Sequence, residues 1–369
     1  MKICFVANLN SIHAIRWIQP LIESKHEVYG VSYVPNNLPL LGAKEIFDLT
    51  KLTNVPKFRF LIWGLWLRRY IKRIQPDILH AHQIPAAGWM CAVTGFHPLV
   101  VTGWGSDLLT ESKKSVLRKI LTKIVLSRTD YFTVPSKIMY AAALELGFPE
   151  EYLYLIPWGV ETNIFKPNQL IRKETRRKLN INENSPVIFC PRGIDPIYNH
   201  DIVIKACRSI ISNIPDLRLI MLKYNTKIEY LKMLEQLIAS ENMHTNVIWL
   251  PTQNTMEDMA HLYQASDIVI SIPSSEGYGF TVYESLASGI PVVITDLPVF
   301  IGELQDQTHV LKVPVRDVDK TIKALEMLIT NPDLRHSLKE KGILISNNLS
   351  NQYRITHVES LYRHIMDPI

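Results

Sequence analysis

The sequence of 369 residues has only four cysteines, no internal repeat and no low-complexity segment. Cys4, Cys91, Cys190 and Cys207 form no CxxC pair, and the first and third lie inside apolar runs, where a small apolar side chain fits. This pattern argues against a disulfide scaffold and a cysteine zinc site, and it indicates a reducing compartment. With 47% hydrophobic and 20% charged residues, the composition is that of a globular protein, and the length favours two domains.

Long apolar segments are also missing. The longest stretch without Asp, Glu, Lys or Arg covers residues 78–106, and it contains His80, His82 and Gln83. A spanning helix would leave those polar groups in hydrocarbon, so we reject one there. The apolar run in the first ten residues, MKICFVANLN, is too short for a signal peptide. We therefore expect a cytoplasmic protein.

Acidic residues are scarce in the first half of the chain. Residues 1–165 hold 18 Lys and Arg against 12 Asp and Glu, whereas residues 166–369 hold 22 against 23. Two stretches contribute six cations each and no acid: KFRFLIWGLWLRRYIKRI at 57–74, with Trp63 and Trp66, and KKSVLRKILTKIVLSR at 113–128. Cations beside apolar side chains suit an anionic membrane surface, and we favour this interpretation over helices that only bury their apolar sides. No nucleic-acid recognition motif is present, so nucleic acid is not an expected partner.

Short apolar runs alternate with longer helical periods along the whole chain, which predicts an α/β fold of parallel sheets covered by helices on both faces. The expected strands cover residues 3–7, 28–33, 78–81, 99–102, 131–134, 154–157, 187–190, 217–222, 247–250, 268–272, 291–295 and 310–313. A polar stretch without strands at 160–184 separates two series of strands. We expect two Rossmann-like domains at 1–165 and 166–350, and a terminal helix at 351–369 that packs back on the first domain.

The segment SSEGYGFTVYESLASGIPVVITD, residues 274–296, places two acids and two glycines after a predicted strand. Gly277 and Gly279 let the backbone approach a ligand closely. The amides of residues 278–281, which are Tyr278, Gly279, Phe280 and Thr281, open a helix and form an anion site. Glu276 lies in the loop, and Glu284, about one turn into the helix, points back over the same pocket. A diphosphate with one carboxylate toward each substituent fits this pattern; a glycine turn between two solvated acids is the alternative.

The segment EGYGFTVYESLASGIPVV resembles the E-x7-E segment of retaining GT-B glycosyltransferases of family four. Other blocks of that family follow in the right order over nearly the whole chain: PDILHAHQIPAAG, VVTGWGSDL, IPWGVETNIFKP, PRGIDPIYNHDIVIKA and LYQASDIVISIPSSEG. The resemblance implies two domains facing each other across a cleft. It also implies front-face transfer of a sugar from a nucleotide-sugar, without a protein nucleophile. In this reading Glu276 contacts the transferred sugar, and Glu284 contacts the nucleoside ribose.

Arg192 follows the predicted strand at 187–190, and its planar guanidinium suits a pair of diphosphate oxygens. A surface salt bridge is the alternative. The family usually has a lysine several residues later, whereas here Tyr198, Asn199 and His200 stand in that place. We therefore expect Arg192 to bind the diphosphate with its charge, and Asn199 to add a hydrogen bond without one.

Three further residues are candidates on the acceptor side. His80 and His82, two positions apart, point to the same side of a strand, and no additional ligand stands near them at a zinc spacing. The resemblance implies a histidine in the sugar pocket; His82 matches it better, and His80 fits a structural role. Asp107 either orients an acceptor hydroxyl or, with Ser106 as the other candidate, caps a helix. In the first loop, which has no glycine, His13 is a weaker candidate.

Asp317 and Asp319 mimic a metal-binding DxD motif, but they precede a predicted helix, where acids favour the helix start. We expect capping there, and neither a metal nor a cofactor.

The catalytic residues are then Glu276, His82 and Arg192, and the acceptor is expected to be a lipid-linked or cell-envelope glycan. The alternatives are a GT-B epimerase or phosphorylase and a non-catalytic sugar- or membrane-binding protein. A dehydrogenase is disfavoured, because no GxGxxG follows a strand.

Overall fold

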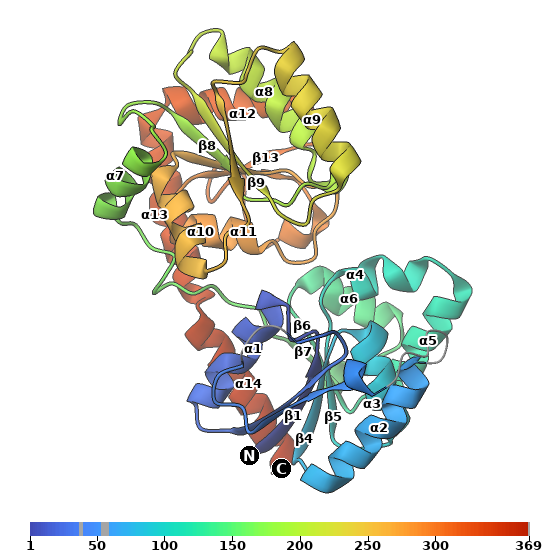
Figure 1. Cartoon of the computed structure of the whole chain (residues 1–369). Helices are drawn as coiled ribbons and strands as arrows, with labels where there is room; N and C mark the ends of the chain where they lie inside the picture. The colour runs from blue at the N-terminus through green and yellow to red at the C-terminus, as the bar shows by residue number, and fades with distance from the viewer. Residues whose placement is uncertain (37–39, 53–58, 368–369) are drawn as a thin grey trace. The chain divides into compact units, whose positions relative to one another are not determined.

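The computed structural model describes residues 1–36, 40–52 and 59–367, and its chain forms two compact units (Figure 1). One unit contains residues 1–158 and 352–369, and the other contains residues 159–351. The first boundary therefore lies before the expected position at residue 165. Local packing explains the difference, since Phe165 lies edge-on to Tyr263 at 5.8 Å, inside the second unit.

The unit of residues 1–158 and 352–369, called here the N-terminal unit, is built on a seven-stranded parallel sheet of order β3-β2-β1-β4-β5-β6-β7. Its strands are β1 Lys2–Ala7, β2 Glu27–Ser32, β3 Glu45–Asp48, β4 Ile78–His82, β5 Leu99–Thr102, β6 Tyr131–Val134 and β7 Leu153–Leu155. Its helices are α1 Ile12–Glu23, α2 Arg59–Ile74, α3 Trp89–Thr94, α4 Ser106–Leu109, α5 Val116–Leu126, α6 Lys137–Glu145 and α14 Asn351–Met366.

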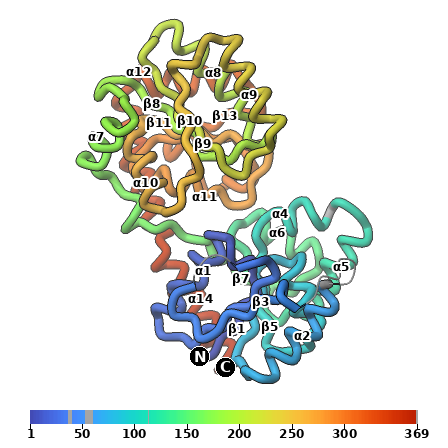
Figure 2. The backbone as a smooth tube through the Cα atoms, in the orientation of Figure 1, coloured from blue at the N-terminus to red at the C-terminus, as the bar shows by residue number. Residues whose placement is uncertain are grey.

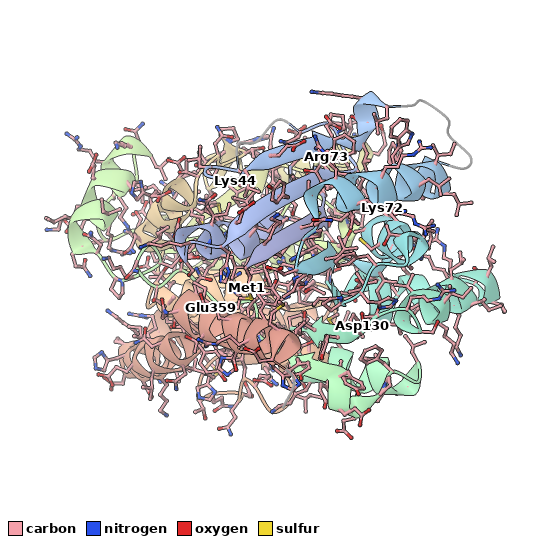
Figure 3. All side chains as sticks on the ribbon, turned by 90° about the horizontal axis from the view of Figure 1, so that it is seen from below. Met1, Lys44, Lys72, Arg73, Asp130 and Glu359 are labelled. Atoms are coloured by element: carbon pink, nitrogen blue, oxygen red, sulfur yellow. The ribbon has the colours of Figure 1, made fainter. Side chains whose placement is uncertain are left out.

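Successive strand residues of this unit pack on opposite faces of the sheet. Cys4 and Val6 of β1 join the core that α2, α3, α5 and α6 cover. Phe5 points to the other face, where His80 contacts Trp17 of α1 and Tyr362 of α14. The terminal helix α14 thus completes the sheet's second face. The carboxylate of Glu359 on α14, labelled in Figure 3, lies 3.7 Å from Nε2 of His26.

The unit of residues 159–351, called here the C-terminal unit, has a six-stranded parallel sheet of order β10-β9-β8-β11-β12-β13. Its strands are β8 Val187–Cys190, β9 Arg218–Lys223, β10 Val247–Pro251, β11 Ile268–Ser271, β12 Val292–Thr295 and β13 Leu311–Val313. Its helices are α7 Gln169–Lys178, α8 His200–Ile211, α9 Ile228–Ser240, α10 Met256–Ala265, α11 Phe280–Ala287, α12 Val318–Thr330 and α13 Pro332–Asn348. Figure 2 traces the backbone of both units.

The α/β expectation is confirmed, and the structure adds elements that the sequence patterns did not predict. Strand β3 is one of them; it is an edge strand whose four residues are only half-buried, so its apolar run is short. Helix α7 is another, with the largely charged sequence QLIRKETRRK. Arg176 anchors α7, because its buried guanidinium binds Asp267 at 2.8 Å and four backbone carbonyls. Among the described residues no helix is both long and apolar enough to span a bilayer.

Candidate functional site

In both sheets the strand order reverses direction beside the first strand, between β1 and β4 and between β8 and β11. Open parallel sheets bind ligands at such switch points, outside the carboxyl ends of the strands. In the C-terminal unit, β8 and β11 pair through Ile188–Ile268 and Phe189–Val269. Arg192 follows β8 and Glu276 follows β11, so the fold brings these two predicted residues to one switch point.

Arg192 is buried there and forms an ion pair with Glu276. Its Nη1 donates to Thr281 Oγ1 at 3.2 Å, and its guanidinium lies 4.4 Å from the centre of the Tyr198 ring. Burial opposes the charge of Arg192, but the Glu276 carboxylate outweighs it and raises the pKa of the guanidinium. Within the described residues Nε of Arg192 is buried without a hydrogen-bond partner. The arginine is thus held charged, and its Nε–H is unused among the described residues.

The glycine loop contains a position that requires glycine. Gly279 precedes α11 with φ of +89°, and a Cβ there would lie 2.9 Å from the Phe300 ring, so only glycine fits. The amide of Gly277 donates to Glu276 Oε1 at 2.9 Å, which fixes the loop carboxylate. Tyr278 stacks on Tyr283 with ring centres 4.9 Å apart, and its buried side chain points into the protein. At Tyr278 it is therefore the backbone that is left to meet a ligand.

Glu284 is buried one turn into α11, and the Tyr263 hydroxyl donates to its Oε2 at 3.0 Å. Burial and the Glu284 carboxylate raise the pKa of Tyr263 well above its ordinary value, so the hydroxyl keeps its proton and remains a donor. Burial raises the pKa of Tyr224 to about 12; Arg192 acts in the opposite direction, and Glu284 adds to the rise. The sequence patterns missed both tyrosines. Tyr263 lies among the buried residues of α10 and resembles a core residue, and Tyr224 follows strand β9 without a motif.

The side chain of Asn199 is already engaged in hydrogen bonds within the protein. It is fully buried with φ of +54°, and its Nδ2 donates to the Ile272 carbonyl at 2.8 Å and to Ser274 Oγ at 3.0 Å. Its Oδ1 accepts from Nη1 of Arg316 at 2.9 Å. The side chain therefore holds the turn before α8 and the loop after β11 together, and it has little capacity left for a diphosphate. Arg316, which no motif indicated, brings a half-exposed guanidinium to this edge of the sheet.

The switch point of the N-terminal unit holds a neutral histidine at the end of β4. His82, at the end of β4, accepts from Trp104 Nε1 at its Nδ1, 3.3 Å away. Burial, with Arg354 as a second cause, lowers the pKa of His82 to about 3, so the ring is neutral. Since an indole N–H only donates, the proton of His82 sits on Nε2. That atom is buried and has no partner in the described part of the chain. His82 therefore offers one N–H donor.

His80 has the structural role that was expected for it. Both of its ring nitrogens are engaged, Nδ1 with the Tyr362 hydroxyl at 2.6 Å and Nε2 with Thr102 Oγ1 at 2.7 Å. Its ring centre lies 4.8 Å from that of His82, so the two histidines do share one side of the strand. His13 lies edge-on to Trp104 and to Trp158, with ring centres at 6.2 and 5.9 Å. The polar ring atoms of the histidines at this switch point thus lie among aromatic rings.

Asp107 is buried, and four backbone amides donate to its carboxylate: those of Ile84, Trp104, Gly105 and Leu108, at 2.8 to 3.3 Å. Burial raises the pKa of Asp107, while these hydrogen bonds act to lower it. The N-cap residue of α4 is Gly105, and no side chain caps this helix. The prediction that Ser106 or Asp107 is the N-cap residue is therefore wrong. Asp107 instead fixes the loop after β5 from inside.

Asp317 is the N-cap of α12, and its carboxylate accepts from the Lys320 amide at 2.8 Å. The expected capping role is confirmed for this residue. Among the described residues no three His, Cys, Asp or Glu side chains are grouped as a metal site would require.

Two family models match successive parts of the chain. The model described as "Glycosyl transferase 4-like" matches residues 2–136, and the one described as "Glycosyl transferases group 1" matches residues 171–344. A D-inositol 3-phosphate glycosyltransferase of Saccharomonospora viridis is 24% identical over 282 residues, which are 70% of this chain and 63% of that protein. One from Mycobacterium marinum is 29% identical over 194 residues, 51% of this chain and 38% of that protein. The chain thus aligns with less than two thirds of the length of these curated relatives.

Solved structures of glycosyltransferases share the fold over nearly the whole length. Anabaena Alr3699/HepE in complex with UDP superposes with a TM-score of 0.84 and 16% identity, covering 98% of this chain and 99% of that one. A glycosyltransferase from Rickettsia africae superposes with a TM-score of 0.83 and 18% identity, covering 99% and 98%. These likenesses show a two-domain α/β fold of the GT-B type.

Proposed function

The chain belongs to the glycosyl transferases group 1 family, and from that premise we propose that it is a retaining glycosyltransferase that moves a sugar from a nucleotide-sugar to a hydroxyl acceptor. One observation carries the proposal. At the switch point of the C-terminal unit, a buried and charged Arg192 pairs with Glu276 in front of the first turn of α11. A cation, a helix N-terminus and a carboxylate at one strand edge suit a diphosphate that carries a sugar.

The donor diphosphate would bind Arg192 and the amides that open α11. Phosphate oxygens and the Glu276 carboxylate then compete for the same guanidinium, so donor binding releases Glu276 from its ion pair. The freed carboxylate accepts hydrogen bonds from the sugar hydroxyls, and Glu284 serves the ribose in the same way. Solved relatives bind UDP and UDP-glucose, which makes a uridine diphosphate sugar the first donor to test.

As the bond to the sugar breaks, negative charge grows on the leaving diphosphate. Arg192 and the dipole of α11 are already oriented before the reaction, so they stabilise this charge without reorganising. This chemistry requires no metal ion.

We assign His82 to the sugar and acceptor side, because its buried Nε2–H is a donor for a hydroxyl oxygen. His13 is assigned to the same side. Asp107 is a positioning residue there, because backbone amides already engage its carboxylate.

We propose a lipid-linked or cell-envelope glycan as the acceptor, which would place the protein in polysaccharide biosynthesis. An epimerase or phosphorylase of the same fold is the second candidate, since the C-terminal switch point would hold the phosphate of a nucleotide-sugar or of a sugar phosphate in those enzymes as well. An epimerase converts the nucleotide-sugar into its isomer without an acceptor and without net release of nucleotide, and a phosphorylase needs inorganic phosphate.

The test is a panel of nucleotide-sugars, with and without acceptor. Thermal shift identifies the donor, because a ligand at 100 times its Kd adds about 2.7 kcal/mol of stability. Nucleotide release is then measured against a glycolipid acceptor, and the anomeric configuration of the product is read by NMR. We expect release that depends on the acceptor and a product that keeps the donor's configuration. Inversion would refute the retaining mechanism, and an isomerised donor without nucleotide release would favour the epimerase.

A further inference from the structure

Helix α5 presents apolar side chains to solvent. Four of them form what is called here the α5 stripe: Val116 at 77% exposed, Leu117 at 65%, Ile120 at 49% and Ile124 at 50%. The stripe lies opposite the buried side of the helix, where Thr122, Val125 and Leu126 face the core. The sequence places apolar side chains among the cations of this segment, and the structure shows that many of them face away from the sheet. Contiguous exposed apolar surface of this kind marks a contact site.

Cations surround the α5 stripe. Lys114 and Arg118 both form ion pairs with Glu111, so their charge is partly balanced. Lys119, Lys123 and Arg128 are exposed, and within the described residues none of the three forms an ion pair. By helical spacing, Lys119 and Lys123 border one side of the stripe and Arg128 borders the other. The stripe is thus an apolar strip between uncompensated positive charges.

The apolar surface continues from α5 toward α2. A groove of about 540 Å³ is lined by Phe60 and Leu61 of α2, residues of α3, and Leu121 and Ile124 of α5, and these three helices lie side by side in Figure 1. On α2 the exposed Leu61 and Leu65 share one side with Arg68 and Lys72, because these positions are three or four residues apart.

The structure also narrows the set of contact residues on α2. Trp63 is buried in the core, so it cannot anchor the protein to a surface as its sequence context suggested; Trp66 is partly exposed, with Arg69 over its ring at 5.1 Å. Arg73 forms an ion pair with Glu45 at 2.5 Å, whereas its neighbour Lys72 is exposed (Figure 3). Lys57 lies outside the described residues, and the side chains of Arg59 and Lys113 are not described.

We propose that the α5 stripe and the adjacent side of α2 dock on an anionic bilayer, with the stripe inserted at the headgroup level and its bordering cations on lipid phosphates. An apolar strip between unpaired cations is what interfacial helices present to anionic lipid. A second copy of the chain would set cations against cations, which is repulsive. The inference rests on the proposed function in one respect: a lipid-linked acceptor lies at the same surface.

Vesicle sedimentation tests the proposal. The full chain is mixed with vesicles of phosphatidylglycerol and phosphatidylcholine, or of phosphatidylcholine alone, at low and at high salt. The stripe variant combines Leu117→Gln, Ile120→Gln and Ile124→Gln. The matched control combines Ile228→Gln and Leu344→Gln, two apolar side chains of the C-terminal unit that are 57% and 65% exposed. We expect the wild type and the control to pellet with anionic vesicles at low salt. The stripe variant should lose about tenfold or more in partitioning, and high salt should release all three.

A second variant, Lys119→Glu with Lys123→Glu, tests the charge separately and should also abolish pelleting. The proposal fails if the wild type ignores anionic vesicles at low salt, or if both variants pellet like the wild type. It also fails if sedimentation velocity without lipid shows a dimer that the stripe variant loses, because the stripe would then belong to a second copy. Binding of UDP by calorimetry reports on the other unit. A chain that binds vesicles yet transfers no sugar would refute the proposed function and leave the docking surface standing.

Discussion

The two units have parallel sheets with the same strand order around the switch point, yet the groups at those switch points differ in charge. In the C-terminal unit Arg192 is paired with Glu276, and Glu284 is buried under a tyrosine hydroxyl. In the N-terminal unit His80 and His82 are neutral, and Asp107 is enclosed by backbone amides. Charged groups suit phosphates, and neutral donors between aromatic rings suit sugar hydroxyls. The contrast supports the proposal that the C-terminal unit binds the donor and the N-terminal unit binds the acceptor.

The contrast also shows that net charge is a poor guide to the site. The first half of the sequence carries the whole basic surplus, but the histidine at the end of β4 in its switch point is neutral. The surplus lies partly on the outward sides of α2 and α5, where it meets solvent. The C-terminal half has nearly balanced charge and still concentrates an ion pair at its switch point. Binding of a small ligand depends on where a few charged groups lie, whereas binding to a charged surface depends on how many charges the protein presents.

We expect the largest effect on activity when a charge is removed from the C-terminal switch point. Glu276→Gln should lower kcat by roughly 10²–10³-fold, the magnitude found when one preorganised polar group at a reaction centre is removed. UDP affinity should stay equal or rise, because Arg192 loses its competing carboxylate. Steady-state kinetics and calorimetry measure the two effects. Glu229→Gln on the exposed side of α9 is the matched control. Wild-type turnover in Glu276→Gln would remove this residue from the reaction.

Acid should destabilise the N-terminal unit through its neutral histidines. The pKa of His82 is lowered to about 3 in the folded state, so below pH 6.5 only the unfolded chain gains the proton. Stability is then fully present above pH 6.5 and falls as the pH drops toward 3, by about 2 kcal/mol at pH 5. Burial lowers the pKa of His80 in the same direction. Urea unfolding at pH 7, 6 and 5 measures the slope, and His82→Gln should make it shallower; an unchanged slope would show that the His82 ring is protonated in the folded protein.

Glu284→Ala should weaken nucleotide binding about tenfold, the cost of one charge-assisted hydrogen bond. Tyr263→Phe keeps the carboxylate and removes only the hydroxyl that donates to it, so its effect should be smaller. Calorimetric titration with UDP compares the two variants. Equal affinity in the wild type and Glu284→Ala would separate this carboxylate from the ribose.

The smallest expected effect is that of a chelator. Because Arg192 and the first turn of α11 are proposed to stabilise the diphosphate, EDTA should change turnover by less than about twofold. The one DxD-like pair does not suggest otherwise, since Asp317 caps α12. A loss of activity that magnesium or manganese restores would show that the charged switch point is incomplete without a cation.

Several features could be predicted from local sequence because their causes are local. Alternation of apolar runs and helical periods predicted the parallel sheets, and most expected strands lie within two residues of the observed ones, such as 187–190 for β8 and 99–102 for β5. The positive φ of Gly279 and the cap at Asp317 follow from residue types within one turn of chain. The edge strand β3 and the charged helix α7 were not predicted, because tertiary contacts rather than an apolar periodicity stabilise them.

The sequence by itself determined the fold class, the motif order and the residues worth testing. Only the tertiary structure decided which of those residues meet and which are already engaged. Arg192 and Glu276 are 84 positions apart, and His80 and Tyr362 are 282 apart, so no local pattern indicates either pair. Asn199 and Trp63 were candidates by their neighbours in sequence, and burial gave them structural roles. The reason is physical: periodicity encodes which side of an element is apolar, but burial and hydrogen-bond partners depend on what the rest of the chain packs against that side.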